Sequence, residues 1–250
     1  MNTEKFSGKA SIYENYRPEY PAAFINYLYQ EIGFSVNNCI ADIGSGTGIL
    51  TRQLLEKGSR VFGVEPNCDM RKKAEEKLSQ FSNFISVDGT AENTKLDSSS
   101  VDFITVAQAF HWFDAYMFRK ECQRVLKPDG MVVLVWNSRV ADSPLVIENA
   151  EICKRFCPGF IGFTGGQDEN PSDFSSFFIK DSYASRCYEN NIAYSLEGYI
   201  GRNLSASYAP KEGEVNYSGF VSALSDLFGK YSNGGSIIVP NITRCYTGKV

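Results

Sequence analysis

The stretch CIADIGSGTG, residues 39–48, decides the fold of this chain. It begins as a short apolar run and ends in three glycines, Gly44, Gly46 and Gly48, before an amphipathic segment starts at Ile49. We expect a buried strand, a tight loop and a helix, because glycine lets the backbone turn sharply and lets a ligand approach closely. In a doubly wound sheet such a loop lies at the carboxyl end of the first strand, where the ligand crevice opens.

The same alternation of strand and helix continues along the chain. Helices are predicted at 21–32, 49–57, 69–80 and 115–126, and further strands at 60–66, 83–89, 101–110 and 131–137, with a KPDG turn at 127–130. Uniformly apolar strands between helices indicate a parallel sheet that is covered on both faces. Beyond Asn137 we expect a loop or lid at 159–176, and strands at 184–190 and 242–250 around a helix at 217–231.

Length and composition narrow the class of protein. A chain of 250 residues without a linker predicts one domain. The net charge of -4 disfavours a nucleic-acid partner, because an acidic protein gains nothing from releasing counterions. With no leader-like start and no long apolar run, we expect a cytoplasmic protein and no membrane partner. Seven cysteines without a CxxC pair, and a single histidine, predict free thiols and no metal.

The loop and its surroundings predict the kind of ligand. The dinucleotide motif GxGxxG would need glycine where this chain has Ile49. Asp42 would repel a pyrophosphate, whereas it could hold a cationic aminoacyl group directly or through water. Glu65, about twenty residues past the loop, stands where an acid accepts hydrogen bonds from both ribose hydroxyls. A methionine-type nucleoside is therefore favoured over NAD, while a merely tight turn and an ordinary strand-end acid stay open as alternatives.

The chain resembles class I S-adenosylmethionine-dependent methyltransferases of type 11. DIGSGTG, VFGVEP, VDGTAE, SVDFITVAQAFHWFD and RVLKPDGMVVLVWN are similar, in order, to that family's motifs from about residue 6 to 137. YENYRPEYP, GTAE, AQAFHWFD, SASYAPKEGE and TRCYTGK resemble the branch that includes trans-aconitate methyltransferase. The resemblance implies a Rossmann-like doubly wound α/β fold with a seven-stranded mixed sheet, order 3-2-1-4-5-7-6. It also implies an N-terminal lid (1–35), a cofactor core (36–140) and an acceptor-side cap (141–250).

The resemblance also implies roles for single residues. The loop residues would lie beneath the methionine part of S-adenosylmethionine, Glu65 with Pro66 would hold the ribose, and Ala91 and Glu92 would border the adenine. The carbonyl of Ala107 would accept from the cofactor's ammonium group. Thr90 departs from the aspartate of many relatives, so adenine recognition could rest on backbone groups. The full predicted cofactor set is Tyr16, Arg17, Asp42, Gly44, Ser45, Gly46, Gly48, Glu65, Pro66, Ala91, Glu92, Ala107 and Gln108.

Methyl transfer from a sulfonium is an in-line displacement, so the protein must mainly align the reactants and exclude water. A general base is needed only for a protonated acceptor, and His111 is the catalytic candidate. Its alternative role is packing or cofactor contact beside the aromatic residues Phe110, Trp112 and Phe113. Four residues of the carboxyl-terminal region could line an acceptor pocket or serve packing: Tyr194, Tyr199, Arg202 and Tyr208. Of these, Arg202 suits a carboxylate.

These observations predict methyl transfer from S-adenosylmethionine, with S-adenosylhomocysteine as product, to oxygen, nitrogen or carbon of a small molecule. A carboxylate-bearing metabolite is one option. Two alternatives remain: a cofactor-binding protein without catalysis, and an NAD-dependent oxidoreductase, which Ile49 disfavours. The sequence identifies neither the acceptor nor the oligomeric state.

Overall fold

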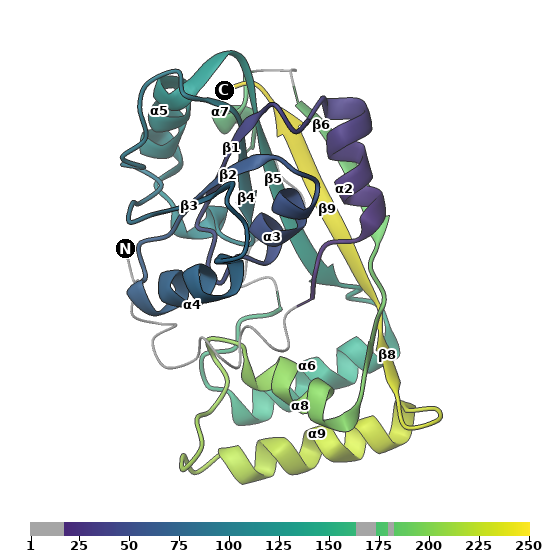
Figure 1. The fold of residues 1–250 in the computed structure, drawn as a ribbon. Helices are drawn as coiled ribbons and strands as arrows, with labels where there is room; N and C mark the ends of the chain where they lie inside the picture. The colour runs from purple at the N-terminus through teal and green to yellow at the C-terminus, as the bar shows by residue number, and fades with distance from the viewer. Residues whose placement is uncertain (1–17, 164–173, 180–182) are drawn as a thin grey trace.

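The computed structural model describes residues 18–163, 174–179 and 183–250, and places an α/β core beside a smaller helical unit (Figure 1). The core sheet has seven strands in the order β3-β2-β1-β4-β5-β9-β6, which confirms the predicted topology. Strands β1 to β5 are parallel, and β9 runs antiparallel between β5 and β6. Their bounds are β1 Cys39–Ile43, β2 Arg60–Val64, β3 Phe84–Val87, β4 Val101–Ala107, β5 Leu126–Arg139, β6 Tyr183–Glu189 and β9 Asn241–Gly248.

The central strands of the sheet are buried on both faces, as their apolar sequences predict. On β5, Val132 and Leu134 pack into one core, and Val133 and Val135 pack into the other. Side chains alternate between the faces of a strand, so a strand covered on both sides is apolar throughout. Helices α5 (Ala115–Val125) and α7 (Phe174–Phe177) contribute to the first core. The second core contains residues of α2 (Ala22–Tyr27), the π-helix η2 (Leu28–Ile32), α3 (Ile49–Glu56) and α4 (Cys68–Leu78).

The predicted KPDG turn at 127–130 is wrong. The strand β5 already begins at Leu126, directly after α5, and this residue pairs with Val101. The pairing then shifts register, and Met131 pairs with Phe103. A bulge of this kind takes up the extra residues and tolerates Pro128, which has no N–H to donate to a ladder.

Three helices form a cap beyond one end of the sheet: α6 (Pro144–Phe156), α8 (Leu196–Leu204) and α9 (Tyr217–Tyr231) (Figure 1). They pack with the two-stranded sheet of β7 (Ile192–Tyr194) and β8 (Ile237–Val239) around a separate hydrophobic core that includes Phe220 and Leu224. The α9 helix confirms the predicted helix at 217–231. The other four elements were not predicted, and most of the predicted lid at 159–176 lies outside the described residues.

In the described ranges, no helix has the length and apolarity that crossing a membrane requires. The same residues contain no cluster of histidine, cysteine and acidic side chains that could hold a metal ion.

Candidate functional site

The three glycines of the loop between β1 and α3 have different structural roles. All have left-handed φ angles: +67° at Gly44, +58° at Gly46 and +82° at Gly48. A Cβ on Gly44 would lie 2.7 Å from the Cβ of Ala109, and one on Gly48 would lie 2.8 Å from Cδ1 of Leu78. A Cβ on Gly46 would meet nothing within 4 Å. Gly44 and Gly48 therefore permit close packing of the protein, and Gly46 keeps the outer side of the loop open.

This open side belongs to a cleft at the carboxyl ends of β1 and β4. These strands are neighbours, and the strand order reverses between them, which is where doubly wound sheets bind ligands. The space between the lining residues is about 470 Å³, its open mouth included. The lining residues are Pro18, Tyr20, Gly44, Ser45, Gly46, Thr47, Ile49, Leu50, Ala107, Gln108, Asn137 and Arg202.

Gln108, directly after β4, has a strained backbone. Its φ is +60°, which is uncommon for a residue other than glycine. The Gln108 side chain donates from Nε2 to the carbonyl of Asn137 at 2.8 Å, and its backbone N–H donates to Val135 at 3.0 Å. Strain of this kind is concentrated at functional sites, where the surrounding structure holds it in place.

Asp42 lies beneath the glycine loop with only 1% of its surface exposed. Its two carboxylate oxygens accept hydrogen bonds from the hydroxyls of Thr51, at 2.6 Å, and Thr105, at 2.8 Å. Burial raises the pKa of Asp42 to about 6, although these hydrogen bonds oppose the rise. The carboxylate thus connects β1 to α3 and β4, and Asp42 is not among the residues that line the cleft.

Glu65 connects the end of β2 to the same loop. Its carboxylate accepts from the N–H of Gly46 at 2.9 Å and from the N–H of Asn67 at 2.8 Å. Burial raises the pKa of Glu65, while both backbone hydrogen bonds and the charge of Arg71 lower it. The predicted ribose acceptor therefore also fixes the position of the most open glycine.

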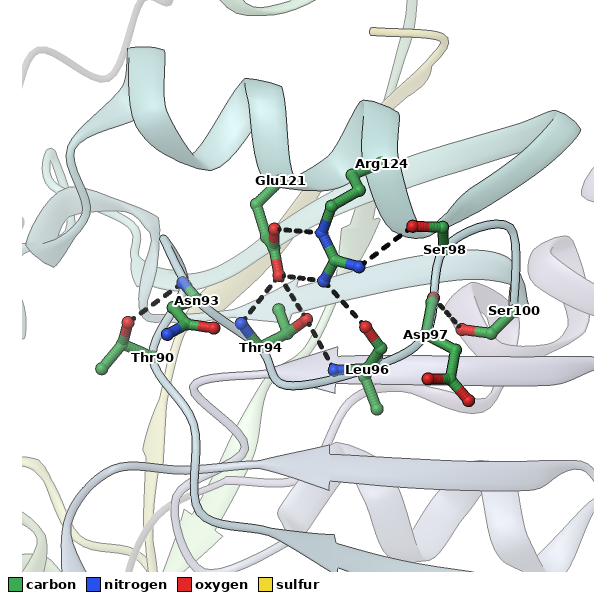
Figure 2. Close-up of polar contacts among 9 residues, drawn as sticks. All are labelled: Thr90, Asn93, Thr94, Leu96, Asp97, Ser98, Ser100, Glu121 and Arg124. Carbon is green, nitrogen blue, oxygen red and sulfur yellow. Dashed lines mark hydrogen bonds and ion pairs between the residues drawn. The ribbon is translucent and has the colours of Figure 1, made fainter.

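The loop after β3, which holds Ala91 and Glu92, is attached to α5 by an ion pair between a buried glutamate and a partly exposed arginine (Figure 2). Glu121 on α5 accepts from the backbone N–H of Thr94 at 2.8 Å and from its hydroxyl at 2.6 Å. Arg124 donates to both oxygens of Glu121, at 2.7 and 2.8 Å, and to the carbonyl of Leu96. Burial raises the pKa of Glu121, but the hydrogen bonds from Arg124 and Thr94 outweigh it and bring the pKa to about 2.

Comparison with known proteins agrees with this geometry. Residues 41–134 match the methyltransferase domain family. This segment of the chain is therefore similar to that family. The chain is 38% identical over 150 residues to an uncharacterized methyltransferase of Mycobacterium tuberculosis, covering 60% of this chain and 59% of that protein. It is 30% identical to an uncharacterized methyltransferase-like protein of Schizosaccharomyces pombe, covering 65% of this chain and 64% of that one. The chain thus spans about three fifths of the length of the curated relatives it matches.

The structural comparison extends over more of the chain. A protein of Anaeromyxobacter dehalogenans, named "Putative Type II Methyltransferase", shares the fold with a TM-score of 0.65 and 21% identity. The match covers 93% of this chain and 97% of that one. The shared fold therefore extends beyond residues 41–134.

The fold brings together five of the predicted cofactor residues in the cleft: Gly44, Ser45, Gly46, Ala107 and Gln108. Glu65 contacts the glycine loop through its hydrogen bond with the N–H of Gly46, and Pro66 is the next residue after Glu65. Glu92 accepts from the N–H of Asp114 at the start of α5, at 3.0 Å. Tyr16 and Arg17 lie outside the described residues.

His111 lies on the short 3-10 helix η3 (Phe110–Trp112), with its ring centroid 4.9 Å from that of Trp112. It is not among the residues that line the cleft, and its catalytic role stays a prediction. Of the four predicted acceptor residues, Arg202 on α8 reaches the cleft, whereas Tyr199 is buried in the core of the cap.

The sequence did not predict the hydrogen bonds that hold residues 18–20 against the cleft. Asn137 donates to the carbonyl of Glu19 at 3.2 Å, and Asn190 donates to the same carbonyl at 2.9 Å. Gln53 donates to the carbonyl of Tyr20 at 2.8 Å and accepts from its N–H at 3.1 Å. The sequence feature that points to this contact is Asn137, a polar residue at the end of an apolar strand beside the switch point.

Proposed function

We propose that this protein transfers a methyl group from S-adenosylmethionine to a small-molecule acceptor. The observation that carries the proposal is the cleft at the switch point, where the open Gly46 faces the same space as Ala107 and Gln108 at the end of β4. A loop that presents no side chain there suits a ligand that must lie against the backbone.

The residues present fit this cofactor. The loop and the carbonyl of Ala107 would hold the methionine part, Glu65 the ribose hydroxyls, and the loop of Ala91 and Glu92 the adenine. Asp42 would act on the ammonium group from below. The cofactor would supply the electrophilic methyl group, and the chain's residues would align the acceptor and keep water out.

The acceptor is proposed to be a small anionic metabolite, with a carboxylate as the simplest case. Among the lining residues that the structure describes, Arg202 alone carries a formal charge, and it comes from the cap. A guanidinium matches the planar geometry of a carboxylate. This would agree with the resemblance to the branch of trans-aconitate methyltransferase. The net charge of -4 supports a small molecule rather than nucleic acid as the partner in the cytoplasm.

Isothermal titration with S-adenosylmethionine, S-adenosylhomocysteine and NADH tests the cofactor. We expect micromolar binding of the first two alone; binding of NADH alone would establish the oxidoreductase instead. Incubation with methyl-labelled cofactor and a panel of small carboxylic acids then tests catalysis. Turnover of any acceptor excludes a protein that binds the cofactor without catalysis. A His111→Asn variant that keeps cofactor affinity but loses turnover would identify His111 as the base.

A further inference from the structure

A cluster of buried hydrogen-bond donors lies between the sheet and the cap. Its centre is Arg139, the last residue of β5, which is 6% exposed. The guanidinium donates to Oδ1 of Asn149 on α6 at 2.6 Å and to Oδ1 of Asn203 on α8 at 3.1 Å. It also lies 4.0 Å from the ring centroid of Phe163. Both acceptors are neutral amides, and none of the ion pairs found in the described residues includes Arg139.

Two further donors of this cluster have no partner within the described part of the chain. Nδ2 of Asn149 is buried without a hydrogen bond, and the hydroxyl of Tyr199 makes none of ordinary hydrogen-bond geometry; the two residues are 2% and 1% exposed. Nearly all buried polar groups in proteins are hydrogen-bonded, so an exception calls for an explanation such as a bound ligand. The carbonyl oxygens of Asn149 and Asn203 already accept from Arg139, so the groups left over are donors.

The charges of the two arginines act on buried groups of the cap. Burial raises the pKa of the Tyr199 hydroxyl, and the charge of Arg139 opposes the rise. A hydrogen bond with Cys157 and burial raise the pKa of the Cys153 thiol, while the charges of Arg139 and Arg202 both oppose that rise. Two guanidinium groups therefore act on one buried thiol of α6.

The cluster adjoins the cofactor cleft. Arg202 lines the cleft and precedes Asn203 of the cluster on α8. Asn137 also lines the cleft and lies two residues before Arg139 on β5, on the same face of the strand. Two members of the cluster are therefore near neighbours, along the chain, of residues that line the cleft.

We propose that Arg139, Arg202, Tyr199 and Asn149 form a subsite for an anionic group of the acceptor, either a carboxylate or a phosphate. This inference rests on the proposed function and adds the residues that select the acceptor. The open hydrogen-bonding capacity is on donors, and Arg139 has no acidic partner among the described residues, so an anion would complete both.

The test uses malonate and inorganic phosphate as probes, titrated calorimetrically into the full chain saturated with S-adenosylhomocysteine at constant ionic strength. We expect saturable binding at one site. Arg202→Gln should weaken it about tenfold or more, the loss that follows from one charge-assisted hydrogen bond. Tyr199→Phe should weaken it severalfold while leaving the thermal midpoint unchanged or raised, because it removes a buried hydroxyl without a partner. A merely structural role of Tyr199 would leave anion affinity unaltered.

The matched control is Arg155→Gln, which removes an exposed cation of the cap that packs over Phe156, outside the cluster. It should leave anion affinity unchanged. No saturable binding, or equal losses in Arg202→Gln and Arg155→Gln, would overturn the proposal.

Arg202 could instead bind the carboxylate of the cofactor itself. In that case S-adenosylhomocysteine would compete with malonate. 5′-Methylthioadenosine, which lacks the carboxylate, would not compete. This pair of results would overturn the assignment of Arg202 to the acceptor. Failure of S-adenosylhomocysteine to bind would count against the proposed function alone, because the anion titration can be repeated without it.

Discussion

Replacing Asp42 by asparagine separates the structural role of this buried carboxylate from its proposed role in binding. Burial raises its pKa from 3.8 to about 6. The folded protein therefore holds the proton more tightly than the unfolded chain, and this contribution to stability is complete below about pH 4 and lost as the pH rises through about 6. A difference of about two pKa units corresponds to about 3 kcal/mol at neutral pH.

The asparagine variant carries no charge to bury. Its amide can accept from the hydroxyl of Thr51 or Thr105 and donate to the other, so that it loses about 1 kcal/mol of charge-assisted bonding at most. We expect Asp42→Asn to be more stable than the wild type by about 1–2 kcal/mol at pH 7, with the difference vanishing toward pH 4. Urea denaturation at several pH values measures this difference. If it stays constant with pH, the reasoning about the buried charge is refuted.

The same variant tests binding. If Asp42 acts on the cofactor's ammonium group, its affinity for S-adenosylmethionine should fall about tenfold despite the gain in stability. Asp129→Asn, at a residue whose side chain is 99% exposed and pairs with Lys249, is the matched control and should change neither quantity. Unchanged affinity in Asp42→Asn would remove Asp42 from the cofactor site.

Three other changes have defined outcomes. Glu121→Gln should lower the free energy of unfolding by about 2 kcal/mol at pH 7, less than the full shift to a pKa of about 2 implies because Arg124 is 39% exposed. The folded pKa of Glu121 is depressed, so this contribution is present above about pH 4.5 and lost as the pH falls toward 2; urea titrations that show equal deficits at pH 7 and pH 3 would contradict it. Gly46→Ala should cost about 1–2 kcal/mol of stability at its φ of +58° and lower S-adenosylhomocysteine affinity in calorimetry, and full affinity would show that the ligand does not lie against this glycine. Gln108→Gly relieves the strained φ of +60° but loses the bond to Asn137, so its denaturation midpoint should stay near that of the wild type; a large loss would mean that the bond dominates.

The glycine loop shows how far prediction from the sequence reaches. Spacing alone predicts the strand, the loop and the helix, and the resemblance predicts the strand order that the structure confirms. The sequence does not distinguish Gly46, which faces open space, from Gly44 and Gly48, which pack against Ala109 and Leu78. The difference depends on which residues the fold brings to each glycine.

The same limit applies to polar residues. Asp42 is predicted from its position before the loop, but its partner Thr105 lies 63 residues further along the chain. The KPDG segment has the composition of a turn and is nevertheless part of β5, where it forms the irregularity between the two residues that pair with β4, Leu126 and Met131.

The sequence by itself determined the α/β class, the loop that shapes the cleft and the faces of the helices, because periodicity and glycine chemistry act between residues close along the chain. Only the tertiary structure decided that Asn137 and Arg202 meet in one cleft and that Arg139 lies buried between Asn149 and Asn203, which is 64 residues away. The physical reason is that burial and hydrogen-bond partners depend on contacts between distant segments. Whether an arginine is a surface charge or the centre of a binding site is settled by those contacts.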